Sequence, residues 1–282
     1  MLFKEAMHKN LLLKPVVKWV GGKRQLLEDI APLVPSSPTI YVEPFVGGGA
    51  VLLYMQPKHA IINDLNEELV NVYRVVRHDA DALLELLLAH EKRNSSEYFY
   101  EVRGLDRTSS FEKLTDVQRA ARIIYLNKTC YNGMFRVNSA GQLNVPYGKY
   151  KHPNIVNRSG IKALETYLQN DIDICCGDYA NCLRDLPKGS FVYLDPPYMP
   201  ITATSAFTGY TEEGFGYSEQ VRLRNECAKL REQGIAFLQS NSHCEQIIDL
   251  YKDFKIKKVR AKRAINSRGD RRGEVDEVLI SG

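Results

Sequence analysis

The sequence predicts an α/β fold built on a mostly parallel β-sheet, because short apolar runs alternate with helical stretches at both ends of the chain. Each run is bounded by polar or turn residues, as buried strands of a parallel sheet are. With 282 residues, of which 44% are hydrophobic and 26% charged, the chain can bury a sizeable core. The expected strands are Thr39–Pro44, Ala60–Asn63, Ile172–Cys176, Phe191–Leu194 and Ile235–Gln239.

Helices and an edge hairpin complete this core. An apolar helix begins near Ala50, and a second, Ser218–Gln233, starts with a capping-type serine and is followed by glycine. Near the C-terminus, Lys255–Arg263 and Val275–Ile280 flank a Gly/Arg-rich turn. This arrangement predicts an antiparallel pair of strands at the edge of the sheet.

The middle of the chain has a different pattern. Glu67–Leu88 and Asp116–Leu126 carry apolar residues at three- and four-residue spacing, which predicts helices. Tyr131–Tyr150 contains the turn sequence Asn138–Gly141 between two extended runs, which predicts an exposed hairpin. We therefore divide the chain into a core, residues 1–66 and 170–282, and an inserted helical domain, residues 67–169, that carries the hairpin near residues 131–150.

Charge is spread unevenly along the chain, whose net charge is +4. Lys255–Arg272 holds nine basic residues and one acid, a local net of +8. A polyanion-binding segment and a solvated edge strand both explain such a run. No stretch reaches the roughly 18 apolar residues of a membrane span, and Leu11–Leu13 is too short for a signal-peptide core. We expect a cytoplasmic protein with no membrane partner and, lacking C-x-x-C pairs and zinc-type His spacing, no metal.

The glycine-rich sequence Glu43–Gly49 follows the first expected strand and predicts a turn that a ligand can approach closely. The dinucleotide pattern is incomplete, because Leu52 takes the place of its last glycine, and Arg24 stands where a phosphate loop needs Ser or Thr. Asp64 closes the next strand, where a carboxylate can accept both hydroxyls of a ribose. This combination fits S-adenosylmethionine, and a plain tight turn is the alternative.

Asp195-Pro-Pro-Tyr198 stands at the carboxyl end of an expected strand, where open α/β sheets bind ligands. The Asp195 carboxylate and the Pro196 carbonyl are two hydrogen-bond acceptors, and Tyr198 adds an aromatic face. Together they suit a planar ring with an exocyclic amino group. Hydrogen bonds from that group would localise its lone pair on nitrogen, which could then attack a sulfonium methyl group. The alternative is a strand-ending turn with a packed tyrosine.

Six motifs stand in order over nearly the whole chain: Lys18–Arg24, Glu43–Gly49, Ile62–Leu65, Tyr131–Asn138, Asn144–Gly148 and Asp195–Tyr198. Together they resemble the Dam-type DNA adenine-N6 methyltransferases, above all the GATC-specific enzymes of Dpn-like restriction–modification systems. The resemblance implies a class I S-adenosylmethionine-dependent methyltransferase (Rossmann-like) sheet with an inserted helical and β-hairpin DNA-recognition domain. It implies methyl transfer from S-adenosyl-L-methionine to N6 of a flipped-out adenine at GATC in double-stranded DNA. A separately encoded restriction endonuclease is then an expected partner.

The same resemblance implies which residues form the site. Those implied for the cofactor are Trp19, Lys23, Phe45, Gly47, Gly49, Asp64, Asp178 and Asp195, and those implied for catalysis on adenine are Asp195, Pro196 and Tyr198. Those implied for DNA are Tyr131 as a wedge in the duplex, Asn132, Met134 and Arg136 at the recognition site, and Asn138, Asn144 and Lys149 on the backbone. The C-terminal loop with Asn266, Ser267 and Arg268 also matches the family.

Physical arguments support these roles. A stacked adenine cannot present its amino group to Asp195, so it must leave the duplex, and an inserted Tyr131 offsets part of the unstacking cost. Arg136 on a hairpin suits a bidentate contact with guanine. Turn scaffolding is the alternative for Asn138 and Asn144. For the whole chain the alternatives are an RNA or protein-glutamine N-methyltransferase on the same core, and a non-catalytic DNA-binding regulator.

Overall fold

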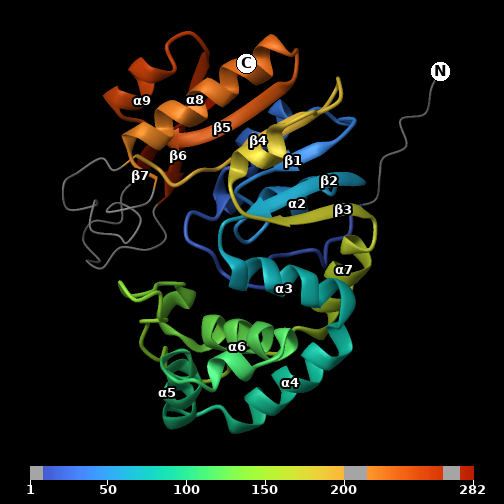
Figure 1. Ribbon diagram of the computed structural model, residues 1–282, viewed down its shortest axis with the longest axis vertical. Coiled ribbons are helices and arrows are strands. Elements are labelled where there is room, and N and C mark those ends of the chain that lie inside the picture. The colour runs from blue at the N-terminus through green and yellow to red at the C-terminus, as the bar shows by residue number, and fades with distance from the viewer. Residues whose placement is uncertain (1–8, 200–214, 263–273) are drawn as a thin grey trace.

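The computed structural model describes residues 9–199, 215–262 and 274–282 and has a mixed α/β fold. Seven strands form one sheet in the order β3-β2-β1-β4-β5-β7-β6 (Figure 1). Strands β1 to β5 pair in parallel, whereas β7 is antiparallel to both β5 and β6. The strands are β1 (Tyr41–Glu43), β2 (His59–Asp64), β3 (Asp171–Cys176), β4 (Phe191–Leu194), β5 (Ala236–Ser242), β6 (Lys255–Lys262) and β7 (Glu274–Ser281). The predicted strands and the antiparallel edge pair are thus confirmed.

The central strands of the sheet are buried on both faces, which explains why β1 and β4 have continuous apolar runs. In β4, Phe191 and Tyr193 join one apolar core, and Val192 and Leu194 join a second. This division follows from the alternation of side chains along a strand. The first core contains residues of α3 and α6, and the second contains residues of α8 and α9. Residues that follow the carboxyl ends of these strands are therefore attached to a well-packed layer.

Nine α-helices lie in the described part of the chain. They are α1 (Leu27–Ile30), α2 (Ala50–Met55), α3 (Glu67–His78), α4 (Ala80–Arg93), α5 (Ser96–Gly104), α6 (Asp116–Thr129), α7 (Arg158–Leu168), α8 (Tyr217–Glu232) and α9 (Glu245–Leu250). The predicted helical stretch Glu67–Leu88 is confirmed except at Asp79, where the backbone leaves the helical region (φ −134°) and separates α3 from α4. The prediction of Ser218 as a cap is also wrong, because the N-cap of α8 is Gly216.

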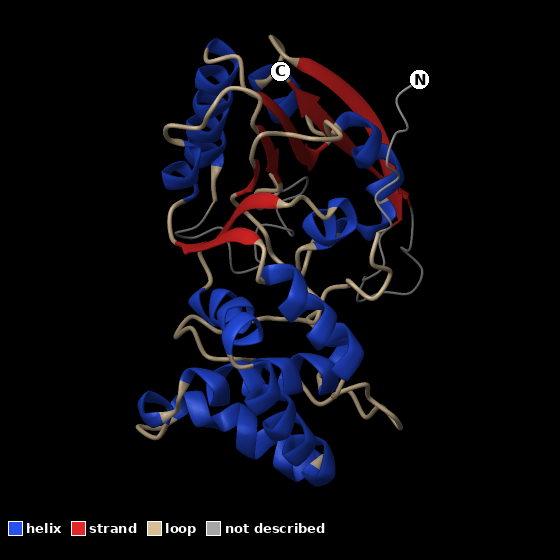
Figure 2. Ribbon diagram, turned by 90° about the vertical axis from the view of Figure 1, so that its right-hand side faces the viewer, coloured by secondary structure: helices blue, strands red, loops and turns tan. Residues whose placement is uncertain are grey.

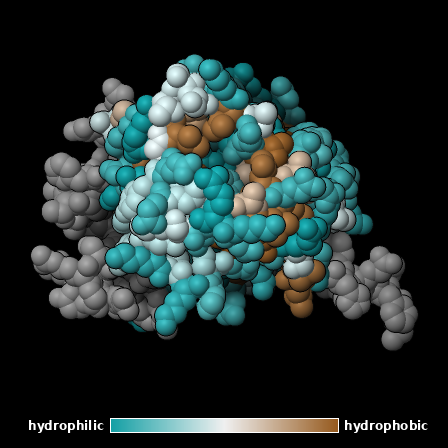
Figure 3. Space-filling model, turned by 90° about the horizontal axis from the view of Figure 1, so that it is seen from below, coloured by the Kyte–Doolittle hydropathy of each residue, from teal (hydrophilic) through white to brown (hydrophobic). Residues whose placement is uncertain are grey.

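Helices α4, α5 and α6 gather at the end of the molecule opposite β5 to β7 (Figures 1 and 2). Viewed from below, this end has mainly hydrophilic side chains with apolar strips between them (Figure 3). Helix α3 connects both parts: Arg77 donates to the Ile172 carbonyl at 2.7 Å on β3, while other residues of α3 pack on α6. No helix in the described ranges is long and apolar enough to span a membrane.

The predicted hairpin is present but has almost no regular pairing. Its two arms meet at isolated bridges, Val137 with Leu143 and Cys130 with Tyr147. The turn is confirmed, since the Gly141 N–H donates to the Asn138 carbonyl at 3.0 Å. Other contacts must therefore hold the hairpin in place.

Candidate functional site

The glycine-rich turn is tied to the end of β2. The Gly47 N–H donates to Asp64 Oδ2 at 3.0 Å, and the Tyr73 hydroxyl donates to the Gly47 carbonyl at 2.9 Å. Gly47 and Gly49 have φ of +49° and +71°, a region that disfavours side chains, and a Cβ at Gly47 would lie 3.0 Å from the Trp19 ring. Burial raises the pKa of the Asp64 carboxyl, and backbone N–H donors oppose this rise. The structure thus brings Trp19, Gly47, Gly49 and Asp64 together.

Trp19 also contacts the hairpin. Its ring stacks on Phe135 with the centroids 4.7 Å apart. Immediately before it, Lys18 is fixed by Asn127, which accepts from the Lys18 N–H at 2.7 Å and donates to its carbonyl at 2.9 Å. The N-terminal motif therefore joins the sheet edge to the root of the hairpin.

Lys23, Asp195 and Tyr198 form one compact cluster. The Lys23 ammonium lies 2.8 Å from Asp195 Oδ1 and 4.7 Å from the centroid of the Tyr198 ring, and it donates to the Gly21 carbonyl at 2.5 Å. The Tyr198 hydroxyl donates to Glu277 Oε2 on β7 at 2.7 Å. Pro196 is buried, and its carbonyl accepts no hydrogen bond from the residues that the structure describes.

The electrostatics of this cluster are set by burial. Burial raises the pKa of the Asp195 carboxyl, and the adjacent Lys23 ammonium opposes that rise. Glu43, 2% exposed, accepts a hydrogen bond from the Tyr41 hydroxyl at 2.6 Å, and burial raises its pKa to about 8. Sequence reasoning assigned no role to Glu43 or Glu277. Glu43 is the first residue of the glycine-rich sequence Glu43–Gly49. The contact of Glu277 with Tyr198 is visible only in the fold.

Polar side chains hold the backbone that follows Asp195. Gln220 of α8 donates to the Pro197 carbonyl at 2.9 Å, and Asn241 of β5 accepts from the Met199 N–H at 3.3 Å. Asn241 also donates to Gln220 at 2.9 Å. Both side chains are fully buried, so this network fixes the segment in one conformation.

Asp178 lies at the carboxyl end of β3, next to Asp64. The preceding Gly177 N–H donates to the Asp64 carbonyl at 3.2 Å. The Asp178 carboxylate accepts two hydrogen bonds from Arg222 of α8, at 2.7 and 2.8 Å, which lower its pKa. Phe45 packs against Tyr179, ring centroids 5.0 Å apart, so the remaining predicted cofactor residues also gather at this edge. Leu65, 78% exposed beside Asp64, is an apolar surface that sequence reasoning missed.

The predicted DNA-binding residues differ in exposure. Tyr131 is 53% exposed, and Lys149 is exposed with a left-handed φ of +52°. Asn132 is also left-handed (φ +58°), and its N–H donates to the Tyr150 hydroxyl at 2.9 Å. Met134 instead packs partly against the main apolar core. Tyr131 is thus exposed, whereas Met134 is partly covered by the core.

Arg136 and Asn144 contact each other across the two arms. Arg136 donates from Nε at 3.2 Å and from Nη2 at 2.8 Å to the Asn144 carbonyl. Asn138 faces its own turn, where its Oδ1 accepts from the N–H groups of Ala140 and Gln142 at 3.0 and 2.9 Å. These bonds match the turn-scaffolding alternative for Asn138.

Three basic side chains gather at the root of the hairpin, and sequence reasoning missed this cluster. They are Lys18, Arg24 and Lys128, and burial followed by the other two charges lowers the pKa of Lys128. None of the three has an acidic partner within 4.0 Å among the described residues. On β6, by contrast, Lys257 and Lys258 are paired with Asp29 and Asp276 at 2.9 and 2.7 Å. Asn266, Ser267 and Arg268 lie outside the described residues.

Comparison with known proteins identifies the family. Residues 19–265 match the family model of the D12 class N6 adenine-specific DNA methyltransferases. The chain belongs to this family. It is 44% identical over 277 residues to the type II methyltransferase M1.LlaDCHI of Lactococcus lactis subsp. cremoris, with 98% of each chain covered. It is 42% identical to the type II methyltransferase M.MjaIII of Methanocaldococcus jannaschii (95% of this chain, 98% of the relative). It is 34% identical to the DNA adenine methylase of Escherichia coli K12 (97% and 95%).

Family membership establishes the reaction: the protein is an N6-adenine DNA methyltransferase. It implies DNA as the substrate and S-adenosylmethionine as the methyl donor. The hypotheses of an RNA or protein-glutamine methyltransferase and of a non-catalytic regulator are therefore set aside. No three His, Cys, Asp or Glu side chains cluster as metal ligands in the ranges that the structure describes.

Proposed function

We propose that the protein methylates N6 of a flipped-out adenine in the duplex sequence GATC. The observation that carries this proposal is the compact cluster of Lys23, Asp195 and Tyr198 at the carboxyl edge of the sheet, beside the glycine-rich turn. The relatives that are DNA adenine methylases support the base and position. The ordered hairpin sequence from Tyr131 to Asn138 supports the site.

The residues at the sheet edge fit S-adenosylmethionine. Asp64 offers carboxylate oxygens to ribose hydroxyls, Leu65 offers an exposed apolar surface, and the tight Trp19–Gly47 contact leaves no room for a side chain in the turn. We assign Phe45 and Asp178 to the adenine end of this site. When bound, the cofactor supplies a methyl group on a positively charged sulfur.

Asp195 and Pro196 orient the target amino group. A carboxylate has about four lone-pair positions, so Asp195 can keep Lys23 on Oδ1 and accept an N–H on Oδ2. Burial raises the pKa of the Asp195 carboxyl, and the positive charge of Lys23 opposes that rise and so favours the ionised form. The Pro196 carbonyl accepts the second N–H, and the Tyr198 ring stacks on the base. With both N–H groups engaged, the nitrogen lone pair points out of the ring system and can attack the donor's methyl carbon as the bond from that carbon to sulfur breaks. The amino nitrogen is then cationic and loses one of its two protons.

The hairpin and the basic cluster bind the duplex. Tyr131 fills the space that the flipped adenine leaves, Arg136 reads a guanine, and Lys18, Arg24 and Lys128 contact phosphates. Asn132, Met134, Asn144 and Lys149 line the same face. In this assignment residues 67–169 act as the recognition domain. The relatives named type II methyltransferases favour a restriction–modification setting, with a restriction endonuclease as partner.

Methylation-sensitive digestion tests the site. A plasmid with GATC sites, incubated with the protein and S-adenosylmethionine, should resist a nuclease that cuts only unmethylated GATC. A plasmid lacking GATC should accept no tritiated methyl groups under the same conditions. Methylation of that second plasmid, or full digestion of the first, would disprove GATC as the site.

A further inference from the structure

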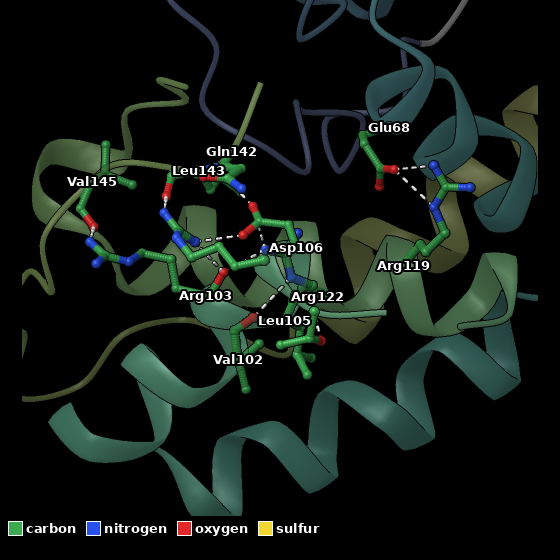
Figure 4. A network of polar contacts seen from close by, with 12 residues as sticks. Glu68, Val102, Arg103, Leu105, Asp106, Arg119, Arg122, Gln142, Leu143 and Val145 are labelled. Carbon is green, nitrogen blue, oxygen red and sulfur yellow. Dashed lines mark hydrogen bonds and ion pairs between the residues drawn. The ribbon is translucent and has the colours of Figure 1, made fainter. Parts of the chain in front are cut away.

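Four charged side chains from α5, the following 3-10 turn and α6 form a connected cluster beside one arm of the hairpin. We call them the arginine clamp: Arg103, Asp106, Arg107 and Arg122. Figure 4 labels three of them, Arg103, Asp106 and Arg122. Arg122 is 2% exposed, and only 10% of the Asp106 side chain is exposed. Burial of Arg122 and Asp106 distinguishes their ion pair from exposed ones such as Lys162 with Asp81, whereas Arg107 lies at the exposed side of the clamp.

The clamp forms hydrogen bonds with the backbone of the hairpin rather than with its side chains. Asp106 Oδ2 accepts from the Leu143 N–H at 2.8 Å, and Arg107 Nη2 donates to the Leu143 carbonyl at 2.7 Å. Arg103 Nη1 donates to the Val145 carbonyl at 2.8 Å. Both polar backbone groups of Leu143 and the carbonyl two residues later are thus fixed, where regular strand pairing is missing.

Contacts within the clamp make it rigid. Asp106 accepts from Arg107 at 2.5 Å and pairs with Arg122 at 2.9 Å. Arg122 donates in turn to the carbonyls of Val102 and Arg103 at 2.9 and 2.8 Å. A buried carboxylate shared in this way has little freedom to move, because each alternative position would leave a charged group without a partner.

The clamped segment also contacts Arg136. Asn144 lies between the two clamped residues, and its carbonyl accepts from Arg136 Nε and Nη2. The Asn144 N–H donates back to the Arg136 carbonyl at 2.8 Å. These bonds occupy one fork of the guanidinium, and Arg136 Nη1 makes no hydrogen bond to any described residue. The Nη1–Nη2 fork is the one available for the O6 and N7 atoms of a guanine.

We propose that Arg103, Asp106 and Arg107 are positioning residues for base recognition, which act by fixing the Asn144 carbonyl that orients Arg136. The inference rests on the proposed function, in which Arg136 reads a guanine of the target site. It extends that function to residues that touch no DNA.

Arg119, on the helix that also carries Arg122, provides a matched control. Arg119 of α6 pairs with Glu68 of α3, donating from Nε to Glu68 Oε1 at 2.8 Å (Figure 4). Arg119 has no hydrogen bond or ion pair to residues of the hairpin in the described part of the chain. Arg119→Gln and Arg107→Gln therefore both remove a paired arginine, but only Arg107→Gln loosens the hairpin.

The experiment compares kcat/KM for a GATC duplex with that for a duplex carrying 7-deazaguanine at both guanines. Losing the N7 acceptor should cost the wild type and Arg119→Gln roughly tenfold. In Arg107→Gln, kcat/KM for the natural GATC duplex should be lower than in the wild type. The ratio of kcat/KM between the natural and the 7-deazaguanine duplex should fall from about ten to no more than about two. Because the penalty is a ratio, it does not depend on how much of each variant is folded. Arg103→Met removes the hydrogen bond from Arg103 to the Val145 carbonyl. It gives a second test, in which the 7-deazaguanine penalty should also fall.

Three outcomes would overturn the proposal. One is a full penalty in both Arg107→Gln and Arg103→Met, and the second is an equal reduction in Arg119→Gln. The third is a wild type that methylates GATC with no penalty at all. A wild type that transfers no methyl group to any GATC duplex would instead refute the proposed function, so the two failures can be told apart.

Discussion

The two functional regions differ in what supports them. At the carboxyl edge of the sheet, Asp195 follows a strand that is buried on both faces. The hairpin is a loop whose arms are joined by isolated bridges. Asp195 follows β4 directly, and its partner Lys23 is 5% exposed. Arg136 is exposed and is held by a backbone carbonyl. The sheet thus fixes the position of Asp195, whereas polar side chains of neighbouring helices fix the position of the hairpin.

The largest expected effect is at the sheet edge. Asp195→Ala should reduce methyl transfer at least about thousandfold, because it removes the acceptor that orients the amino group. Cofactor binding, measured by equilibrium dialysis, should remain detectable, because Asp64 and the glycine-rich turn are unchanged and Asp195 is only one of the residues implied for the cofactor. Asp173→Ala, which removes an exposed carboxylate from β3, is the matched control and should keep normal transfer. Transfer within tenfold of the wild type in Asp195→Ala would contradict the assigned role.

The second prediction concerns stability at the same edge. The pKa of Glu43 is about 8 in the folded chain, against 4.5 for an ordinary glutamate. Between these values the unfolded chain releases the proton and the folded chain keeps it, so the folded state loses stability as pH rises. Glu43→Gln should therefore raise the free energy of unfolding by roughly 4 kcal/mol at pH 8 and by less than about 1 kcal/mol at pH 5.

Urea denaturation at the two pH values measures this difference. Glu97→Gln, a change at an exposed glutamate of α5, provides the control and should alter neither value by more than about 0.5 kcal/mol. Parallel pH profiles for Glu43→Gln and the wild type would show that Glu43 is ionised in the folded chain.

A third, smaller effect is expected on the hairpin. Tyr131→Ala should reduce transfer on a matched duplex by about tenfold, because unstacking the adenine costs a few kcal/mol that the inserted ring partly offsets. A mismatch opposite the target adenine lowers that cost, so the loss should largely disappear on a mismatched duplex. An equal loss on both duplexes would mean that Tyr131 acts on something other than base flipping. The free energy of unfolding should change little, since the side chain is 53% exposed.

The smallest expected effect distinguishes DNA binding from cofactor binding. Arg24→Ala should make the slope of log K against log salt less steep by about 1, as expected for the loss of one phosphate contact. The affinity for the cofactor should stay the same. Lys58→Ala, at the opposite end of β2, should leave the slope unchanged. A slope that stays the same in Arg24→Ala would remove the basic cluster from the DNA interface.

Sequence patterns predicted the sheet well because its residues are specified locally. Phe191–Leu194 is a continuous apolar run followed by Asp-Pro-Pro-Tyr, so both the strand and its functional end are visible in eight residues. The break at Asp79 was missed because the apolar periodicity continues through it.

Contacts between distant segments could not be predicted in the same way. Glu277 reaches Tyr198 across 79 positions, and Asp106 reaches Leu143 across 37. Neither acid has a local pattern that separates it from a solvated side chain. The proposed roles of the site residues remain predictions that the variants above can test.

Trp19 offers a practical consequence, since it is the only tryptophan of the chain. One side of its ring meets the glycine turn, and its face stacks on Phe135 of the hairpin. Indole fluorescence depends on the immediate surroundings of the ring, so a single native emission band reports on both neighbours. Unlabelled protein can therefore be titrated with methyl donor or with duplex, and the order in which the two ligands load can be followed in real time.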